Sequence, residues 1–287
     1  MENKAFAYIF TLTATLVLLG AGCENKTNEA SRTEIAVTNS YLGCAVLDLC
    51  GDDTEILCLA PPGMCPGHFD ISPSQVKQLC ECRMLLLFDF QKSVVQTLSR
   101  MEERGLKTAI VGKPGGLCVP ETYLAICRKV SDILSSEYPE RQAQYEQRLE
   151  VIENNLKQLQ HEFSGKIRRA GISSVKVLTS NHQSDFANWL GLETLATFIG
   201  SDMETVTGVD HCIKKAEGQD VRFVIANKQE GTALAEALAE RLGARTVVFS
   251  NFPELYGQTS GFNALLRANV NALLRANESD SLKVARQ

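Results

Sequence analysis

The chain contains four histidines and ten cysteines, whose nitrogen and sulfur atoms are ligands that transition metals prefer in proteins. His68 and His182 each follow a segment that is expected to form a strand, 54–60 and 175–180 respectively. Ligands bind parallel sheets at the carboxyl ends of the strands. We therefore predict that these two histidines, one from each half of the chain, face each other across a cleft. The other two are expected at the surface (His161 and His211).

Cysteine offers a further ligand beside the first of these histidines. Cys65 lies three residues before His68, and Met64 precedes it with a thioether. Thiolate and imidazole together suit Zn²⁺, or Cu⁺ if the thioether joins them. The alternative, which is the commoner state of thiols outside the cytoplasm, is a disulfide between Cys65 and Cys58 or another nearby cysteine.

The segments that would position these residues alternate between strand and helix. In the first half, the apolar runs at 35–38, 54–60, 84–90 and 107–111 predict strands, and 41–49, 74–82 and 91–104 predict helices. In the second half, strands are expected at 175–180, 195–199, 221–227 and 245–251, with helices at 184–190 and 232–242. This order is typical of parallel sheets with helices on their faces.

One long helix is expected between the two halves. Residues 140–163 contain no Pro or Gly, and their apolar side chains recur at the spacing of one helix face. We therefore predict two α/β lobes with parallel sheets, at 34–136 and 166–287, joined by a rigid linking helix at 137–165. A repeated NALLRAN near the C-terminus predicts an amphipathic terminal helix.

The N-terminus gives an expected location. An uncharged run at 5–19 is followed by Gly20-Ala21-Gly22-Cys23, which resembles the lipobox of bacterial lipoproteins. The prediction is a signal peptide at 1–22, lipid on Cys23, and a polar tether at 23–33. The protein would then face the periplasm or the exterior from a membrane anchor. An ordinary signal peptide with an incidental cysteine is the alternative.

Composition argues against a disordered chain and against a nucleic-acid-binding protein. With 44% hydrophobic and 22% charged residues, the chain is that of a folded protein. Its net charge of −5, without a run of Lys or Arg, argues against binding nucleic acid.

Four segments resemble the zinc/manganese solute-binding lipoproteins of bacterial ABC importers. LAPPGMCPGHFDISPSQVKQL is similar to the first metal-ligand loop of that family, LCVPETYLAICRKVSDIL to the region of the second ligand, and SNHQSDFANWLGLE to the third. FVIANKQEGTALAEALAERLGARTVVF resembles the last ligand segment. The resemblance implies two α/β lobes with a linking helix, a monomer that is not an enzyme, and delivery of a metal ion to a membrane permease.

Only half of the family's ligand set is present in this chain. His68 and His182 fall on two ligand positions, whereas the second position falls on Gly115 and the expected carboxylate falls near Asn227. The resemblance thus implies a metal site with His68, His182, Cys65 and Asn227. With no carboxylate evident, Zn²⁺ is favoured over Mn²⁺, which prefers oxygen donors. A chelated or small organic ligand in the same fold, and a thiol oxidoreductase, are the alternatives.

Overall fold

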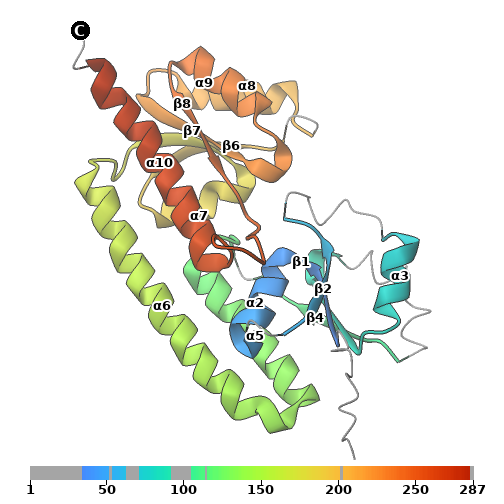
Figure 1. Cartoon of the computed structure of the whole chain (residues 1–287). Helices are drawn as coiled ribbons and strands as arrows, with labels where there is room; N and C mark the ends of the chain where they lie inside the picture. Colours follow the sequence, from blue (N-terminus) through green and yellow to red (C-terminus); the bar gives the residue numbers. More distant parts are fainter. Residues whose placement is uncertain are drawn as a thin grey trace, which may run out of the picture. The chain divides into compact units, whose positions relative to one another are not determined.

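The computed structural model describes residues 34–51, 54–62, 71–91, 105–113, 115–200 and 203–284, with side chains as far as 278. Residues 33–287 belong to one compact unit (Figure 1). Five predictions fall outside the described residues: the signal peptide, lipid on Cys23, the tether, the loop with Cys65 and His68, and nearly all of the helix at 91–104.

The N-terminal sheet has four parallel strands in the order β2-β1-β3-β4. They are β1 (Ile35–Asn39), β2 (Ile56–Ala60), β3 (Met84–Phe88) and β4 (Lys107–Val111). The accompanying helices are α2 (Ser40–Cys50), α3 (Pro73–Leu79) and α5 (Pro120–Glu137). The central strands β1 and β3 are buried along their whole length, as expected for strands covered on both faces.

The C-terminal sheet repeats this arrangement, with parallel strands in the order β6-β5-β7-β8. Its strands are β5 (Lys176–Ser180), β6 (Glu193–Phe198), β7 (Val221–Asn227) and β8 (Arg245–Phe249). Its helices are α7 (Ser184–Trp189), α8 (Val206–Ala216) and α9 (Ala233–Leu242). The predicted fold class of two parallel α/β lobes is confirmed.

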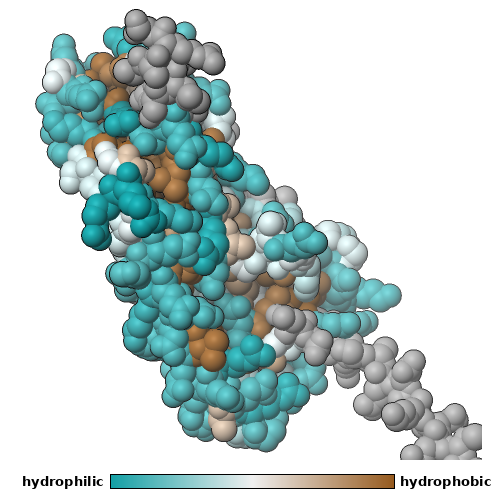
Figure 2. Space-filling view, turned by 60° about the vertical axis from the view of Figure 1, so that its left-hand side comes forward, coloured by the Kyte–Doolittle hydropathy of each residue, from teal (hydrophilic) through white to brown (hydrophobic). Residues whose placement is uncertain are grey.

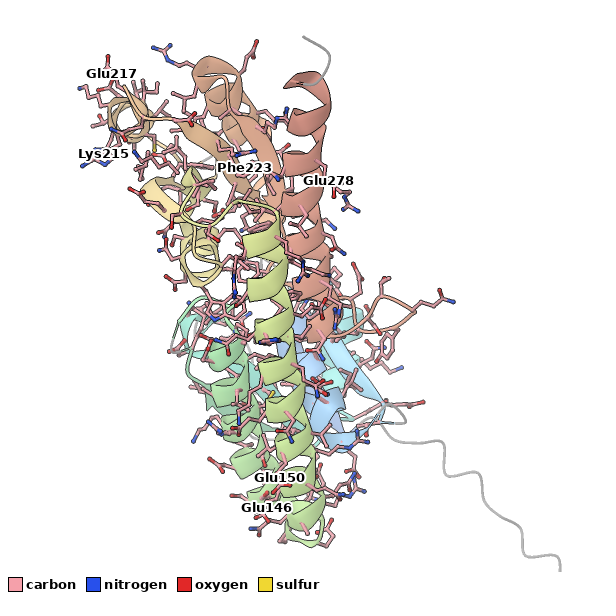
Figure 3. The ribbon with its side chains drawn as sticks, turned by 90° about the vertical axis from the view of Figure 1, so that its left-hand side faces the viewer. Glu146, Glu150, Lys215, Glu217, Phe223 and Glu278 are labelled. Atoms are coloured by element: carbon pink, nitrogen blue, oxygen red, sulfur yellow. The ribbon has the colours of Figure 1, made fainter. Side chains whose placement is uncertain are left out.

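The linking helix α6 (Gln142–Arg169) has 28 residues, about 42 Å at 1.5 Å per residue. It extends four residues beyond the predicted end, because Gly165 does not stop it and three basic residues in the last turn complement the helix dipole. In Figure 3, Glu146 and Glu150 project from its outer side, whereas Phe223 lies within the C-terminal lobe.

Helix α10 (Phe262–Val284) runs beside α6 and carries the repeated NALLRAN (Figure 1). Its apolar side packs into a hydrophobic core that also takes residues from both lobes and from α6. Two smaller clusters lie on the other faces of the sheets. Both lobes and the linking helix therefore share one main core.

Helix α8 was not expected from the sequence. Gly208 in its first turn obscures the helical pattern, but the side chain of Thr205 caps the helix by accepting a hydrogen bond from the Gly208 amide. His211 is exposed on this helix, and His161 is exposed on α6, as predicted.

Hydrophilic residues cover most of the face shown in Figure 2, and apolar residues form separate patches there. Within the part of the chain that the structure describes, none of the helices has the length and apolar character needed to cross a membrane.

Candidate functional site

A pocket of about 500 Å³ lies between the carboxyl ends of the two sheets. Its wall includes residues that directly follow β3, β4, β5, β7 and β8, which is the edge where parallel sheets bind ligands. The lining residues are Phe90, Lys113, Gly116, Leu117, Asn181, His182, Ser184, Asp185, Asn227, Gln229, Glu230, Asn251 and Phe252. His182 and Asn227, two of the predicted metal ligands, therefore face the same pocket.

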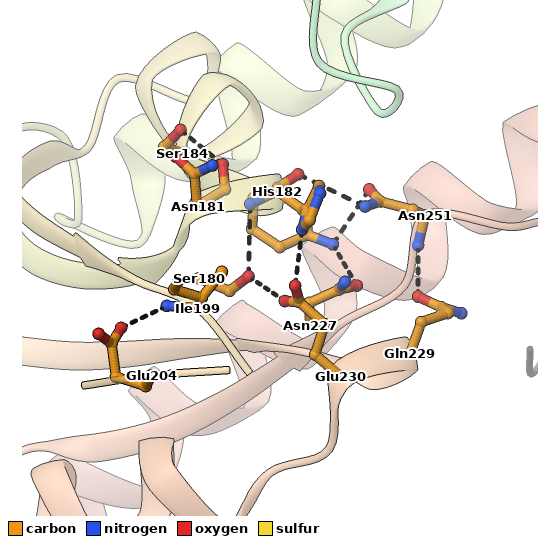
Figure 4. Close-up of polar contacts among 11 residues, drawn as sticks. Ser180, Asn181, His182, Ser184, Ile199, Glu204, Asn227, Gln229, Glu230 and Asn251 are labelled. Carbon is orange, nitrogen blue, oxygen red and sulfur yellow. Dashed lines mark hydrogen bonds and ion pairs between the residues drawn. The ribbon is translucent and has the colours of Figure 1, made fainter. Parts of the chain in front are cut away.

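His182 forms an ion pair with Glu230 in this wall (Figure 4). Its Nδ1 lies 2.7 Å from Oε1 of Glu230, and Oγ of Ser180 donates to Oε2 of the same carboxylate over 2.5 Å. The imidazole is 56% exposed, whereas the Glu230 side chain is 15% exposed. When the imidazole is neutral, a carboxylate that accepts from Nδ1–H leaves Nε2 with its lone pair, which is the form of imidazole that binds a metal; when the imidazole is protonated, the same contact is an ion pair.

The contact between His182 and Glu230 shifts the pKa of each group so that its charged form is favoured. The hydrogen bond that His182 donates to Glu230 raises the pKa of His182 above its ordinary value, against the opposing effects of burial and of Lys113. Burial raises the pKa of Glu230, but hydrogen bonds from His182 and Ser180 outweigh it, so that the carboxyl pKa is lowered overall. Glu230 is therefore ionised at neutral pH, and it adds a negative charge to the pocket.

Two short 3-10 helices bring these side chains together. One (Asn181–Gln183) follows β5 directly, and the Ser180 hydroxyl caps it by accepting from the His182 amide over 3.3 Å. The other (Lys228–Glu230) follows β7 and ends at Gly231, whose φ of 83° is accessible to glycine at little cost. Because β5 and β7 are neighbours in the sheet, the residues that follow them meet.

Buried amides form the floor beneath this ion pair. Nε2 of Gln183 donates to Oδ1 of Asn227 and to Oδ1 of Asn251, each over 3.1 Å. All three side chains are at most 3% exposed. Asn251 also donates to the carbonyl of His182 over 3.4 Å. Asn227 is thus held in the floor, where its oxygen already accepts a hydrogen bond.

Contacts between the lobes close the pocket at its sides. Nε2 of Gln229 donates to the carbonyl of Pro62 over 3.0 Å, and Sγ of Cys118 donates to the carbonyl of Ser250 over 3.1 Å. Pro62 is the last described residue before the segment that carries Cys65 and His68. Pro62 itself contacts Gln229, a residue of the pocket wall.

The wall near the second ligand position of the family is tightly packed. A Cβ at Gly115 would lie 2.8 Å from Oγ1 of Thr122, and one at Gly116 would lie 2.5 Å from Cβ of Asp185. Gly116 allows the N-terminal lobe to approach α7 closely, and Gly115 makes room for Thr122 of α5. A side chain at either position would require its neighbours to move.

Glu230 is the residue that sequence reasoning missed, and the premise that the site lacks a carboxylate is wrong. The signal was present, because Glu230 follows β7 as His182 follows β5, and the two strands were expected in one sheet. Asp185 also lines the pocket and offers a second carboxylate there. Among the residues that the structure describes, no three His, Cys, Asp or Glu side chains are grouped to hold a metal ion.

The cysteines provide a second correction. Seven described cysteines are free thiols, namely Cys44, Cys50, Cys58, Cys80, Cys118, Cys127 and Cys212. Sγ of Cys58 donates to the carbonyl of Ala60 over 3.2 Å, whereas Cys65, its expected partner in the disulfide alternative, lies outside the described residues. Burial raises the pKa of the Cys58 thiol to about 12, so that it is protonated at neutral pH.

Solved structures of metal-binding proteins share this fold. A manganese-bound periplasmic metal-binding protein from Candidatus Liberibacter asiaticus is 11% identical and superposes with a TM-score of 0.73 over 85% of this chain and 99% of its own. A crystal structure of ZnuA is 16% identical, with a TM-score of 0.68 over 85% of this chain and 99% of its own. At this identity the likeness shows the fold alone.

A family comparison gives a more specific result. No curated protein sequence matches the chain significantly. The family model described as "Zinc-uptake complex component A periplasmic" matches residues 118–276, which is more than half of the chain and includes both His182 and Glu230. The chain therefore belongs to the family of the periplasmic component A of zinc-uptake complexes.

Proposed function

We propose that this protein captures a transition-metal ion in the pocket between its lobes and delivers it to the membrane permease of an ABC importer. The observation that carries the proposal is the ion pair of His182 and Glu230 in the pocket wall. A carboxylate that orients a histidine through Nδ1 is a common companion of metal-ligating imidazole. The family is one of transport components, so the chain is not an enzyme, and the thiol oxidoreductase alternative is abandoned.

The ligand set that we propose joins His182 of the C-terminal lobe to His68 and Cys65. Both residues lie outside the described part of the chain, but their segment begins at Pro62, beside Gln229 of the pocket wall. Asn227 belongs to the floor and provides an amide oxygen. We expect Glu230 to orient His182.

Zinc is the ion that these donors favour. Imidazole and thiolate bind Zn²⁺ more tightly than Mn²⁺ in the Irving–Williams order, and Cu⁺ would compete where thioether and thiolate both bind. Solved structures with this fold are described as bound to manganese, cadmium and zinc, so the fold itself does not select the ion.

A lipid on Cys23 would hold the protein at the cell envelope, facing the periplasm or the exterior. The uncharged run at 5–19 and the small residues before Cys23 support this location. We expect the protein to act as a monomer that docks on its permease.

Calorimetric titration of zinc and manganese into untagged protein tests the proposal. His182→Ala and His68→Ala should each weaken zinc binding by about 100-fold or more, since even the outer partners of a metal ligand are worth roughly 10–100-fold. His161→Ala, which removes an exposed histidine from α6, should leave the affinity unchanged. Equal zinc affinity in all four proteins would refute a site at His182. Manganese binding as tight as zinc would refute the metal preference.

A further inference from the structure

The size of the pocket exceeds what a bare ion needs. At about 30 Å³ per molecule, a pocket of about 500 Å³ holds on the order of fifteen waters. Zinc bound by imidazole has metal–nitrogen distances of about 2.0–2.1 Å, so that its ligands must converge on one point. A volume of this size is instead typical of sites for small organic molecules.

Apolar side chains line part of the wall. Phe90, Leu117 and Phe252 face the pocket, and Phe90 is 48% exposed. Its ring is stacked on Phe88, with 5.2 Å between the centroids and 21° between the planes. An ion gains little from an exposed aromatic ring, whereas a carbon skeleton placed against it buries apolar surface.

A positive charge lies in the same wall. Lys113, just after β4, donates to the carbonyl of Gly115 over 2.7 Å and faces the pocket opposite the elements that carry His182. Its ammonium lies in the same wall as the imidazole of His182. It would repel a bare metal ion bound at His182, whereas the carboxylates of Glu230 and Asp185 in this wall would attract the ion.

A ligand that combines a metal ion, a carboxylate and a carbon skeleton would match the carboxylates, the ammonium and the apolar side chains of this wall together. We propose that the pocket receives the metal as a complex with a small carboxylate-bearing chelator of the amino-acid or hydroxy-acid class. Nε2 of His182 then binds the metal at an open coordination position, Lys113 pairs with a carboxylate of the chelator, and Phe90 and Phe252 contact its carbon skeleton. This inference rests on the proposed function and specifies its substrate.

Titrations with four probes test it: zinc alone, zinc with L-histidine, zinc with citrate, and L-histidine alone. A chelator lowers the free zinc concentration, so a protein that binds the bare ion must bind less in its presence. We expect the opposite, namely that at least one complex binds about tenfold tighter than zinc alone, a gain of about 1.4 kcal/mol. L-Histidine without zinc should bind far more weakly.

Two lysine variants provide the matched comparison. Lys113→Ala should weaken binding of the complex by about tenfold while leaving binding of zinc alone unchanged or tighter, because one ion pair is lost and one repulsion is relieved. Lys129→Ala removes an exposed lysine of α5, outside this pocket, and should bind like the original protein.

The outcomes separate this inference from the proposed function. If both chelators reduce zinc binding in proportion to their own affinity for zinc, the proposal that the pocket binds a metal–chelator complex is wrong, and the proposal that the protein captures a metal ion is supported. If Lys113→Ala binds the complex as tightly as Lys129→Ala does, the assigned role of Lys113 is wrong. If neither zinc nor either complex binds, or if L-histidine alone binds as tightly as its complex, both proposals fail.

Discussion

At the scale of single residues, the ion pair of His182 and Glu230 carries most of the chemistry. Oε1 of Glu230 lies 2.7 Å from Nδ1 of His182, so the carboxylate selects the tautomer whose Nε2 is available to a metal. The same contact stabilises the imidazolium. A proton and a metal ion therefore compete for Nε2 of His182, and the contact with Glu230 favours the binding of either one.

Glu230→Gln should lower the pKa of His182 toward its ordinary value, because the amide has no negative charge. The pKa of folded His182 is raised, so the stabilisation of the folded protein by Glu230 is fully present below about pH 6.5 and is lost as the pH rises through the raised pKa. The variant should thus lose more stability at pH 6 than at pH 8. NMR titration of the imidazole and urea unfolding at the two pH values measure these effects.

Glu150→Gln on the exposed side of α6 is the control and should leave the His182 titration unchanged. An unchanged pKa of His182 in Glu230→Gln would contradict the ion pair.

In the original protein, zinc affinity should fall as the pH drops from about 7.5 to 5.5, since the metal requires neutral imidazole.

At the scale of elements, the close approach of Gly116 to α7 sets the contact between the lobes. Gly116→Ala places a Cβ 2.5 Å from Cβ of Asp185, an atom fixed to the helix backbone. Overpacking of this kind costs about 1–3 kcal/mol. Chemical unfolding should show that loss, whereas Gly112→Ala, whose Cβ would lie 4.0 Å from the nearest atom, should not. Equal stability of the two variants would mean that α7 can move away from the added methyl group at little cost in free energy.

The elements themselves were largely predictable, because apolar runs mark buried parallel strands whatever they pack against. All eight described strands lie within or close to the predicted segments. The existence of α5 and α8 and the end of α6 were missed. Gly165 and Gly208 look like breaks, although α6 continues through Gly165 and the Thr205 cap lets α8 begin just before Gly208. Glu230 was missed for another reason. Its partner is 48 residues away, and the short turn that aims it has no periodic pattern.

At the scale of the whole molecule, we predict that attachment to a membrane depends on Cys23. Cys23→Ser should move the protein from the membrane fraction to the soluble fraction, because acyl chains on this residue would be the anchor. Fractionation followed by immunoblotting measures the change, and Cys212→Ser, at a buried free thiol, is the control. A mutant as firmly attached as the original protein would rule out the lipobox.

The main hydrophobic core includes residues of both lobes and of α6, such as Leu42, Phe163 and Phe249. Because the lobes share this core, neither can expose its part without opening the other, and the chain should unfold in a single transition. Two probes report on the two lobes. The only tryptophan, Trp189, stacks on Phe186 in the C-terminal lobe, and the buried thiol of Cys127 lies on α5 beside the N-terminal sheet.

We therefore expect tryptophan fluorescence and labelling of Cys127, identified by mass spectrometry, to give the same midpoint in guanidinium chloride. Phe163→Ala, which empties a fully buried position on α6, should lower both midpoints together, at a cost of about 3–5 kcal/mol. Val151→Ala on the same helix, where the side chain is 49% exposed, should shift neither by a comparable amount. Two separated transitions, or a Phe163→Ala midpoint that moves for one probe only, would show that the lobes fold as independent units. In that case α6 would be a tether between them, and the pocket would lack the rigid frame that holds its two walls in register.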